Sequence, residues 1–223
     1  NHEIMNSVAP ITSLSSTISG YYKEDGIKKK PGNIDEKTIS NTLKGLSIIE
    51  EHGKGLINFV DSYRSLTKMP EIKPVEQPVK DIFESIIILA ASLKEEKYPG
   101  LNLSLNNTVE PEDLIICADE NLLTRVLFNL VKNSIEAIEG SPDPSVELHA
   151  ERSRDGKVII KVSDNGHGID EDLVEKVFVP FFTTRERGSG IGLSLSRQII
   201  NMHKGNISVK STPGQGTTMI ISI

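Results

Sequence analysis

Two asparagines, Asn129 and Asn133, stand four residues apart in a segment, 120–139, whose apolar residues recur at helical spacing. On a helix this spacing places both carboxamides on one face. Carboxamide oxygens suit a hard cation such as Mg²⁺, so the pair is a candidate metal site. The alternative is that both amides only satisfy backbone groups, since buried polar groups need partners.

A second candidate is the run Asp164-Asn165-Gly166-His167-Gly168, which ends a predicted strand. Glycines there permit a tight turn and let a ligand approach the backbone closely. The carboxylate of Asp164 is then placed to accept a hydrogen bond from an exocyclic amine such as that of adenine. An ordinary turn is the alternative, because Asp, Asn and Gly are common turn residues. We interpret His167 as structural.

A third candidate is the glycine-rich run 188–193, which directly precedes a predicted helix. Backbone N–H groups at a helix N-terminus bind phosphates. The run lacks the ending of a P-loop and does not follow a strand in a βαβ unit, which argues against a dinucleotide-binding motif. The preceding segment, 179–187, is apolar at one end and basic at the other. We interpret it as a lid, with Gly188 and Gly190 as hinges.

The elements that must position these residues alternate between helical and strand periodicity. We predict helices at 80–97, 120–139 and 191–202, and strands at 101–105, 114–117, 145–151, 157–163, 206–210 and 217–223. The pair Asp155-Gly156 predicts a hairpin between two of these strands. Helices with mostly antiparallel strands predict an α+β fold with an α/β sandwich. Cys117 is expected to be a small buried hydrophobic residue in its strand.

Residues 1–69 show helical periodicity interrupted by a polar segment, 20–33, and predict an antiparallel helical hairpin with Asp35 capping its second helix. The pattern breaks at 69–74, so we divide the chain into domains at 1–69 and 70–223. One hairpin buries too little apolar surface to be stable alone. Packing on its own chain and pairing with a second copy as a four-helix bundle both fit the pattern.

Composition narrows the function classes. The 223 residues carry a formal net charge of −6, which gives no electrostatic reason to expect nucleic-acid binding. One cysteine allows no internal disulfide and fits a reducing compartment. No run approaches the roughly 20 apolar residues of a membrane span, and no signal peptide is visible. We expect a cytoplasmic fragment without membrane contact of its own, cut from a longer protein that can be membrane-anchored.

The order of these motifs resembles the ATP-binding domain of the family that contains bacterial histidine kinases, DNA gyrase, the Hsp90 chaperones and the MutL repair proteins. The resemblance covers roughly residues 74–223. It implies that Mg²⁺ is held by Asn133, with Asn129 as a further metal-site residue beside the phosphates of ATP, and that Asp164 binds the adenine amine. It also implies nucleotide contacts for Lys132, Gly166, Gly168, Phe178, Thr183, Thr184, Arg185, Gly188, Gly190, Gly192, Leu193, Gly216 and Thr217.

Two features favour a histidine kinase over the other members. ATPases of the family commonly place a Glu four residues before the metal-binding Asn, where it activates water, and this chain has Asn129 there. The segment 178–184 also resembles a kinase lid, with Arg185 where Lys is frequent. The candidates for neutralising charge on the phosphoryl group are Lys132, Arg185 and Arg187.

Residues 2–10 resemble the phosphoacceptor box of histidine kinases, in which His2 and Glu3 are followed by Pro10. Imidazole is a nucleophile near neutral pH, and Glu3 is placed to accept the ring proton as the other nitrogen attacks. The resemblance implies autophosphorylation of His2 and transfer to an aspartate of a response regulator receiver domain. Through Asn6 it implies phosphatase activity toward that regulator, and it implies a homodimer.

Two other classes are open at this point. A non-catalytic ATP-binding dimerisation scaffold would bind nucleotide without forming a phosphoprotein, and the pair of His2 and Glu3 argues against it. A family ATPase acting on protein conformation would hydrolyse ATP steadily, and the amide at Asn129 argues against that class.

Overall fold

The computed structural model consists of two compact units, Asn1–Lys68 and Met69–Ile223. It describes residues 2–24, 27–29, 34–67, 71–185 and 190–223. Side chains are described throughout these ranges except at 2–7, 24, 58–59 and 61–67. The predicted domain boundary between residues 69 and 70 lies outside the described residues.

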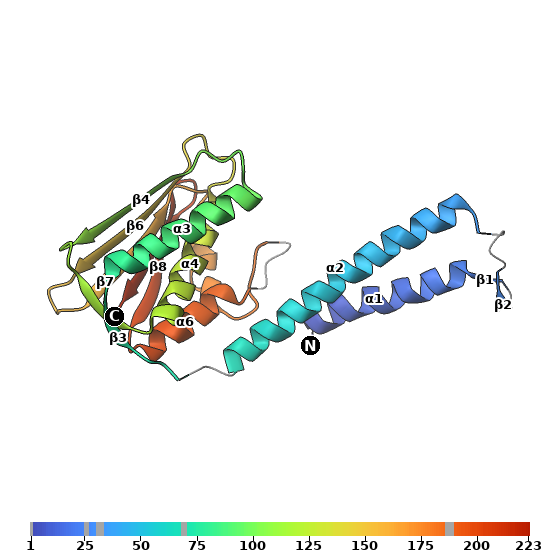
Figure 1. Cartoon of the computed structure of the whole chain (residues 1–223), viewed down its shortest axis with the longest axis horizontal. Helices are drawn as coiled ribbons and strands as arrows, with labels where there is room; N and C mark the ends of the chain where they lie inside the picture. The colour runs from blue at the N-terminus through green and yellow to red at the C-terminus, as the bar shows by residue number, and fades with distance from the viewer. Residues whose placement is uncertain (1, 25–26, 30–33, 68–70, 186–189) are drawn as a thin grey trace. The chain divides into compact units, whose positions relative to one another are not determined.

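The first unit is a helical hairpin (Figure 1). Helix α1 spans His2–Tyr21 and contains Pro10, and helix α2 spans Glu36–Thr67. The helices approach closely at Gly45 of α2, where an added Cβ would lie 2.8 Å from Cδ1 of Ile18. The predicted hairpin is therefore confirmed, and a glycine sets the distance between its helices.

Helix α2 begins with a side-chain cap. The carboxylate of Asp35 accepts the backbone N–H of Thr38 at 2.8 Å, and the hydrogen bonds from Thr38 lower the pKa of Asp35.

The segment predicted as a plain loop contains two short strands, β1 (Lys23–Glu24) and β2 (Ile27–Lys28), which pair antiparallel. The loop is thus shorter than predicted, because α1 also continues to Tyr21.

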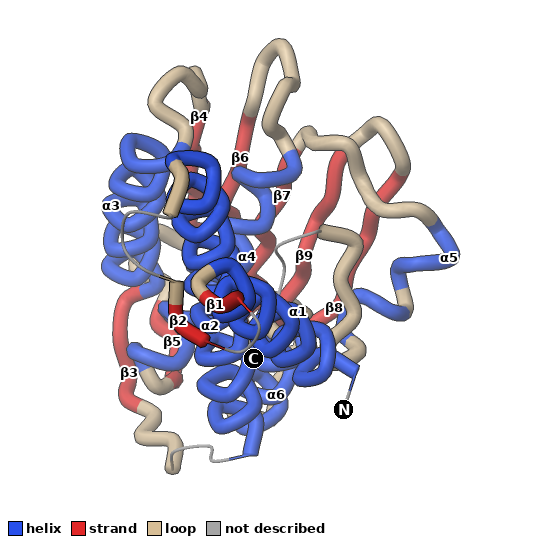
Figure 2. Tube along the Cα trace, turned by 90° about the vertical axis from the view of Figure 1, so that its right-hand side faces the viewer, coloured by secondary structure: helices blue, strands red, loops and turns tan. Residues whose placement is uncertain are grey.

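The second unit is built on a five-stranded sheet with the order β4-β6-β7-β9-β8 (Figure 2). Its strands span Ser104–Glu110 (β4), Ser145–Arg152 (β6), Val158–Asp164 (β7), Asn206–Thr212 (β8) and Gly216–Ser222 (β9). Strands β4 and β6 are parallel, and the other neighbours are antiparallel. A separate antiparallel pair is formed by β3 (Val75–Pro78) and β5 (Ile115–Ala118).

Three helices cover one face of this sheet: α3 (Val79–Lys97), α4 (Glu120–Ala137) and α6 (Gly192–Met202) (Figure 1). Two short helices, α5 (Glu171–Val174) and the 3-10 helix η2 (Lys176–Phe178), precede α6. The predicted α/β sandwich is confirmed. Within the described ranges, no helix has the length and apolar character needed to cross a membrane.

The core of the second unit lies between the sheet and these helices. Alternate residues of β7, Ile160 and Val162, are fully buried, and so are Leu123 and Leu127 at helical spacing on α4. Burying each such side chain contributes about 1.5–3 kcal/mol. This packing fixes α4 against β7, and β7 ends at Asp164.

Two sequence predictions about strands are wrong in part. The strand predicted at 101–105 begins only at Ser104, where pairing with β6 starts. Cys117, expected to be buried, is exposed. The reason is that β5 has one solvent face: Ile116 and Ala118 are buried, and Ile115 and Cys117, which alternate with them, are exposed.

Candidate nucleotide-binding site

Asp164 lies at the C-terminal end of β7. Its Oδ1 accepts the backbone N–H groups of Gly166 (3.0 Å) and Thr217 (3.2 Å), and its Oδ2 accepts the hydroxyl of Ser134 on α4 (2.9 Å). Burial raises the pKa of Asp164, although these three hydrogen bonds lower it. The carboxylate is therefore held in one orientation by groups from α4, the β7 turn and β9.

Two glycines allow the backbone to approach Asp164 closely. Gly216 has a φ of 99°, and an added Cβ would lie 1.9 Å from the carbonyl oxygen of Asp164. A Cβ on Gly166 would lie 2.5 Å from the carbonyl oxygen of Ala137 at the end of α4. Any larger residue at either position requires the backbone to move.

The turn continues through His167 and Gly168. Gly168 has a φ of 73°, and an added Cβ would lie 2.3 Å from the carbonyl oxygen of Thr212. The backbone N–H of His167 donates to Ala137 (3.2 Å), and its carbonyl accepts the N–H of Gly214 (2.8 Å). His167 thus ties the turn to α4 and to the β8–β9 loop. Beside it is a hollow lined by Ala137, Gly140, Asp143, Asn165, Gly166 and Gly214.

Asn129 and Asn133 project from the same face of α4 but have different partners. The Nδ2 of Asn129 donates to the hydroxyl of Ser196 on α6 at 3.1 Å. A Cβ on Gly192 would lie 2.4 Å from the Oδ1 of Asn129, so glycine lets the first residue of α6 approach this amide. Leu193 follows Gly192 in the first turn of α6. Asn129, predicted from its spacing on α4, therefore lies beside the predicted glycine-rich run at Gly192.

Asn133 lies within a cluster of charged side chains. The Nη1 of Arg185 donates to its Oδ1 (3.1 Å), and the Nη2 donates to its backbone carbonyl (3.2 Å). Arg185 also forms an ion pair with Glu136, and the Nζ of Lys132 lies 3.8 Å from the Oε1 of Glu136. Desolvation lowers the pKa of Lys132, and the positive charges of Lys97 and Arg185 add to this effect.

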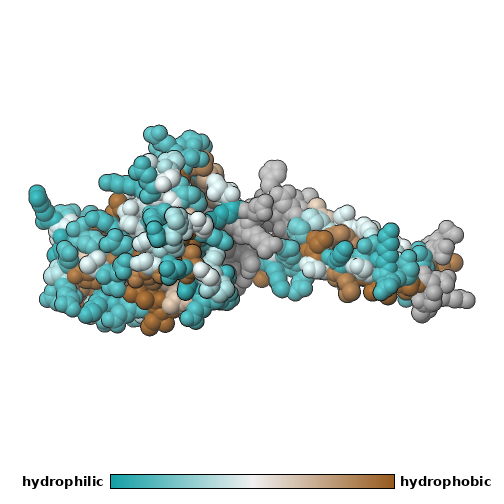
Figure 3. Space-filling view, turned by 90° about the horizontal axis from the view of Figure 1, so that it is seen from above, coloured by the Kyte–Doolittle hydropathy of each residue, from teal (hydrophilic) through white to brown (hydrophobic). Residues whose placement is uncertain are grey.

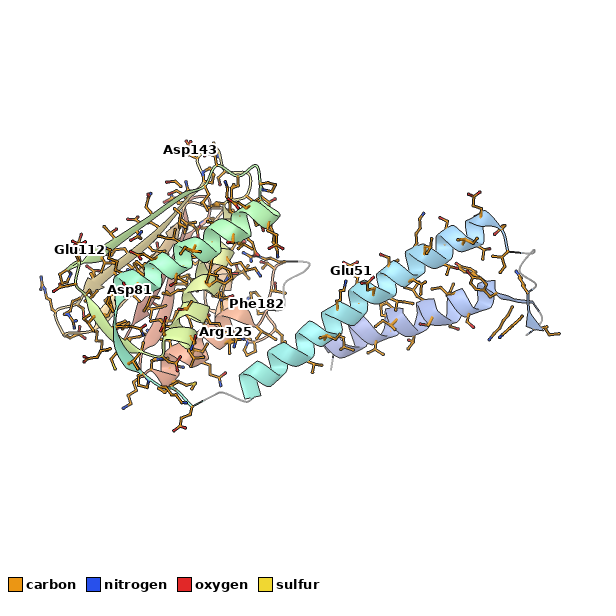
Figure 4. All side chains as sticks on the ribbon, viewed as in Figure 1. Glu51, Asp81, Glu112, Arg125, Asp143 and Phe182 are labelled. Carbon is orange, nitrogen blue, oxygen red and sulfur yellow. The ribbon has the colours of Figure 1, made fainter. Side chains whose placement is uncertain are left out.

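The segment between η2 and α6 is anchored at its base. Phe178 is buried, and the guanidinium of Arg197 lies 4.0 Å from the centroid of its ring. The backbone N–H of Phe181 donates to the carbonyl of Gly190 at 2.9 Å, and the φ angles of these residues are 67° and 65°. Phe182, labelled in Figure 4, comes next in the segment.

Beyond this base, the hydroxyl of Thr183 accepts the backbone N–H of Arg185 at 3.1 Å. Thr184 is exposed. Two other predicted residues of the segment, Arg187 and Gly188, lie outside the described residues. Arg185 thus connects the described part of the lid to α4.

The predicted phosphoacceptor residues His2, Glu3 and Asn6 belong to α1, with side chains outside the described ones. Their roles stay predictions. In the second unit, the predicted residues form one group around Asp164 and another around Asn133. The roles of both groups in nucleotide binding also stay predictions.

Sequence reasoning missed three polar residues that each contact a predicted site residue: Ser134, Glu136 and Ser196. Glu136 offered a signal, because it lies three residues after Asn133 on the same helix and so shares its face. The two serines offered none, since a single hydroxyl on a helix face has no distinctive spacing.

The oxygen donors at Asn133 fit a hard cation. Among the residues that the structure describes, no three His, Cys, Asp or Glu side chains gather as a complete metal site. The single carboxamide oxygen of Asn133 suits Mg²⁺, which commonly keeps several waters and binds few protein groups together with substrate phosphates. The residues present therefore fit magnesium brought with a nucleotide.

Comparison with known proteins defines the class of the second unit. Residues 118–223 match the family described as "Histidine kinase-, DNA gyrase B-, and HSP90-like ATPase". An alignment of 220 residues is 42% identical to the signal transduction histidine-protein kinase AtoS of Escherichia coli (strain K12). It covers 99% of this chain and 33% of that protein. The chain spans less than half the length of the curated relatives it matches.

Solved structures agree with this class. The catalytic domain of histidine kinase ThkA is 33% identical, with a TM-score of 0.58 over 68% of this chain and 95% of that chain. ThkA in complex with response regulator protein TrrA is 28% identical, with a TM-score of 0.68 over 100% of this chain and 58% of that chain. The chain therefore belongs to the histidine kinase family.

Proposed function

We propose that this chain is the catalytic core of a two-component sensor histidine kinase. It binds Mg-ATP in the second unit, transfers the γ-phosphoryl group to His2 and passes it to an aspartate of a response regulator. The half-buried, oriented carboxylate of Asp164 is the observation that carries the nucleotide part of the proposal. The likeness to histidine kinases along the whole chain supports the transfer part.

Asp164 is suited to select adenine. Three hydrogen bonds from Gly166, Thr217 and Ser134 orient the half-buried carboxylate. A carboxylate has roughly four acceptor positions, so it can still accept an amine proton. A hollow lined by Asn165, Gly166 and His167, the residues that follow Asp164, supports the same placement of the base.

The phosphates would lie between α4 and α6. The first backbone N–H groups of an α-helix have no partner within the helix, so the N-terminus of α6 is suited to phosphates, and Gly192 keeps that end close to Asn129. Asn133 would hold Mg²⁺, which supplies neutralisation of phosphoryl charge when bound. Lys132 and Arg185 are the described cations beside Asn133 that are placed to assist.

The acceptor part of the proposal concerns α1. His2 would act as nucleophile, with Glu3 accepting its ring proton. Asn6, one turn further along α1, would orient water for dephosphorylation of the response regulator. ThkA is described in a complex with the response regulator TrrA, which supports a receiver domain as partner. The homodimer is part of the same proposal.

Incubation with γ-labelled Mg-ATP tests the function, comparing the chain with His2→Gln and Asp164→Asn. We expect acid-labile, alkali-stable label on the unchanged protein and none on either variant. Label that persists in His2→Gln would show that another residue is the acceptor. Steady hydrolysis without phosphoprotein would favour a family ATPase, and tight nucleotide binding without label or hydrolysis would favour a scaffold.

A further inference from the structure

The guanidinium of Arg185 is held on Asn133 by several contacts at once. It donates to the Oδ1 (3.1 Å) and to the backbone carbonyl (3.2 Å) of Asn133, and it forms an ion pair with Glu136. Arginine offers five donors in a rigid fork, so one guanidinium can satisfy all three acceptors together. The position of Arg185 is therefore specified by α4 and is not that of a freely rotating surface side chain.

Glu136 is the anchor of this arrangement. Its carboxylate contacts both Arg185 and Lys132, and its side chain is only 23% exposed. Partial burial reduces screening by water, so the charges act on one another more strongly than at an open surface. Two cations and one anion leave this cluster with an excess positive charge beside the Oδ1 of Asn133.

We propose that Arg185 and the divalent cation compete for the side-chain oxygen of Asn133, and that Glu136 is the positioning residue that holds Arg185 in the competing place. The inference rests on the proposed function. A metal ion bound about 2 Å from this oxygen would face a guanidinium nitrogen on the same atom, and like charges at such separations repel strongly. Metal binding thus requires Arg185 to leave, and its release frees a cation for the phosphates.

Two substitutions preserve the charge of the side chain but remove the hydrogen-bonding geometry that holds Arg185 on Asn133. Arg185→Lys keeps the positive charge but lacks the fork that contacts both oxygens of Asn133. Glu136→Asp keeps the negative charge but shortens the side chain that reaches Arg185. Matched controls are Arg125→Lys and Glu120→Asp, which change exposed residues of the same helix; Arg125 is labelled in Figure 4.

The readout is equilibrium binding of ADP by calorimetry, from chelated metal to millimolar Mg²⁺, with the half-saturating Mg²⁺ concentration as the measured quantity. We expect both variants to lower it roughly tenfold, the scale of one charge-assisted hydrogen bond, while both controls stay within about twofold of the unchanged chain. A double variant should show no more than the single effect, because the two residues act through one contact.

An unchanged Mg²⁺ dependence in Arg185→Lys would overturn the competition, because only the charge would then matter. An increased requirement in Glu136→Asp would make Glu136 a group on the metal side and would also overturn the proposal, as would no change in that variant. If the unchanged chain bound no ADP at any Mg²⁺ concentration, the proposed function itself would fail. Binding with an unmoved Mg²⁺ dependence removes the competition alone.

Discussion

At Asp164, the burial that orients the carboxylate also makes its charge costly. The group is surrounded by α4, the β7 turn and β9, and it accepts three hydrogen bonds without a cationic partner among them. Its pKa is raised because desolvation outweighs those hydrogen bonds. A carboxyl group whose charged form is disfavoured in this way is expected to serve binding more than stability.

Asp164→Asn tests whether Asp164 serves nucleotide binding more than the stability of the fold. The amide keeps one oxygen for the N–H groups of Gly166 and Thr217, and the hydroxyl of Ser134 can turn to accept from the new NH₂ group. We expect nucleotide affinity to fall by about 2 kcal/mol, roughly 30-fold, because a hydrogen bond to a charged acceptor is lost. The melting temperature should stay equal or rise. Calorimetric titration and thermal melting measure the two effects, with Asp113→Asn, an exposed residue that does not line the hollow, as control; a large loss of stability in Asp164→Asn would contradict this account.

The raised pKa of Asp164 also predicts a pH dependence. The folded state holds this proton more tightly than the unfolded state does. Unfolding free energy is therefore lost as pH rises from the usual value of 3.8 through the folded pKa, and the loss is complete above it. The difference in melting temperature between Asp164→Asn and the unchanged chain should grow in favour of the variant over this interval. Melting curves of both proteins from about pH 4 to pH 7 measure it, and a constant difference would refute the sign.

At the scale of elements, Asp119 joins three segments. Its Oδ1 caps α4 by accepting the N–H of Leu122 (3.1 Å), and its Oδ2 accepts the N–H of Lys73 (3.0 Å). Its own backbone N–H donates to the Nε2 of His203 at the end of α6 (2.9 Å). The hydrogen bonds from Lys73 and Leu122 lower the pKa of Asp119. One residue thus sets where α4 begins and how it meets α6.

Asp119→Ala should destabilise the start of α4 by about 1 kcal/mol, the usual effect of losing an N-cap. Asp119→Asn retains an acceptor oxygen and should lose much less. Amide hydrogen exchange is the suitable readout, with faster exchange expected at the first turn of α4 and at Lys73. Equal protection in the alanine and asparagine variants would show that the cap contributes little here.

The elements differ in how far the sequence could predict them. Periodicity predicted α3, α4 and α6 because each buries one continuous apolar stripe. Strand β3 was missed, because its partner β5 lies about forty residues away and its own side chains do not alternate in polarity. Cys117 was assigned to the wrong face because a short apolar run does not reveal that only one side of its strand is covered.

The site shows the same limit at the scale of the whole molecule. Motif order predicted Asp164, Asn133 and the glycines, because their chemistry depends on residue type and local spacing. The contact between Arg185 and Glu136 joins residues 49 positions apart, and no local pattern encodes which cation reaches which carboxylate. Tertiary packing alone supplies that information, and the cluster became visible only in the folded chain.

The hairpin unit exposes an apolar stripe that a second copy could cover. On α2, Ile39, Leu43, Leu46, Ile57 and Val60 share one face by helical spacing and are 48–63% exposed. Figure 3 shows hydrophobic side chains at the surface of this unit. The buried hydrophobic residues of the described chain all belong to the second unit, so the described side chains of the hairpin include no buried hydrophobic residue. An isolated hairpin of this kind is unstable in water, which favours a homodimer.

Leu43→Glu should therefore weaken self-association. Each side chain of this size contributes about 1.5 kcal/mol when buried, and two-fold symmetry counts the change twice, so the dissociation constant should rise roughly 100-fold. The matched control is Ile48→Glu, because Ile48 is 42% exposed on the opposite face of α2. Sedimentation equilibrium over a range of concentrations distinguishes the two. A dimer that resists Leu43→Glu but dissociates in Ile48→Glu would place the interface on the other face, and a monomeric unchanged chain would remove the homodimer from the proposed function.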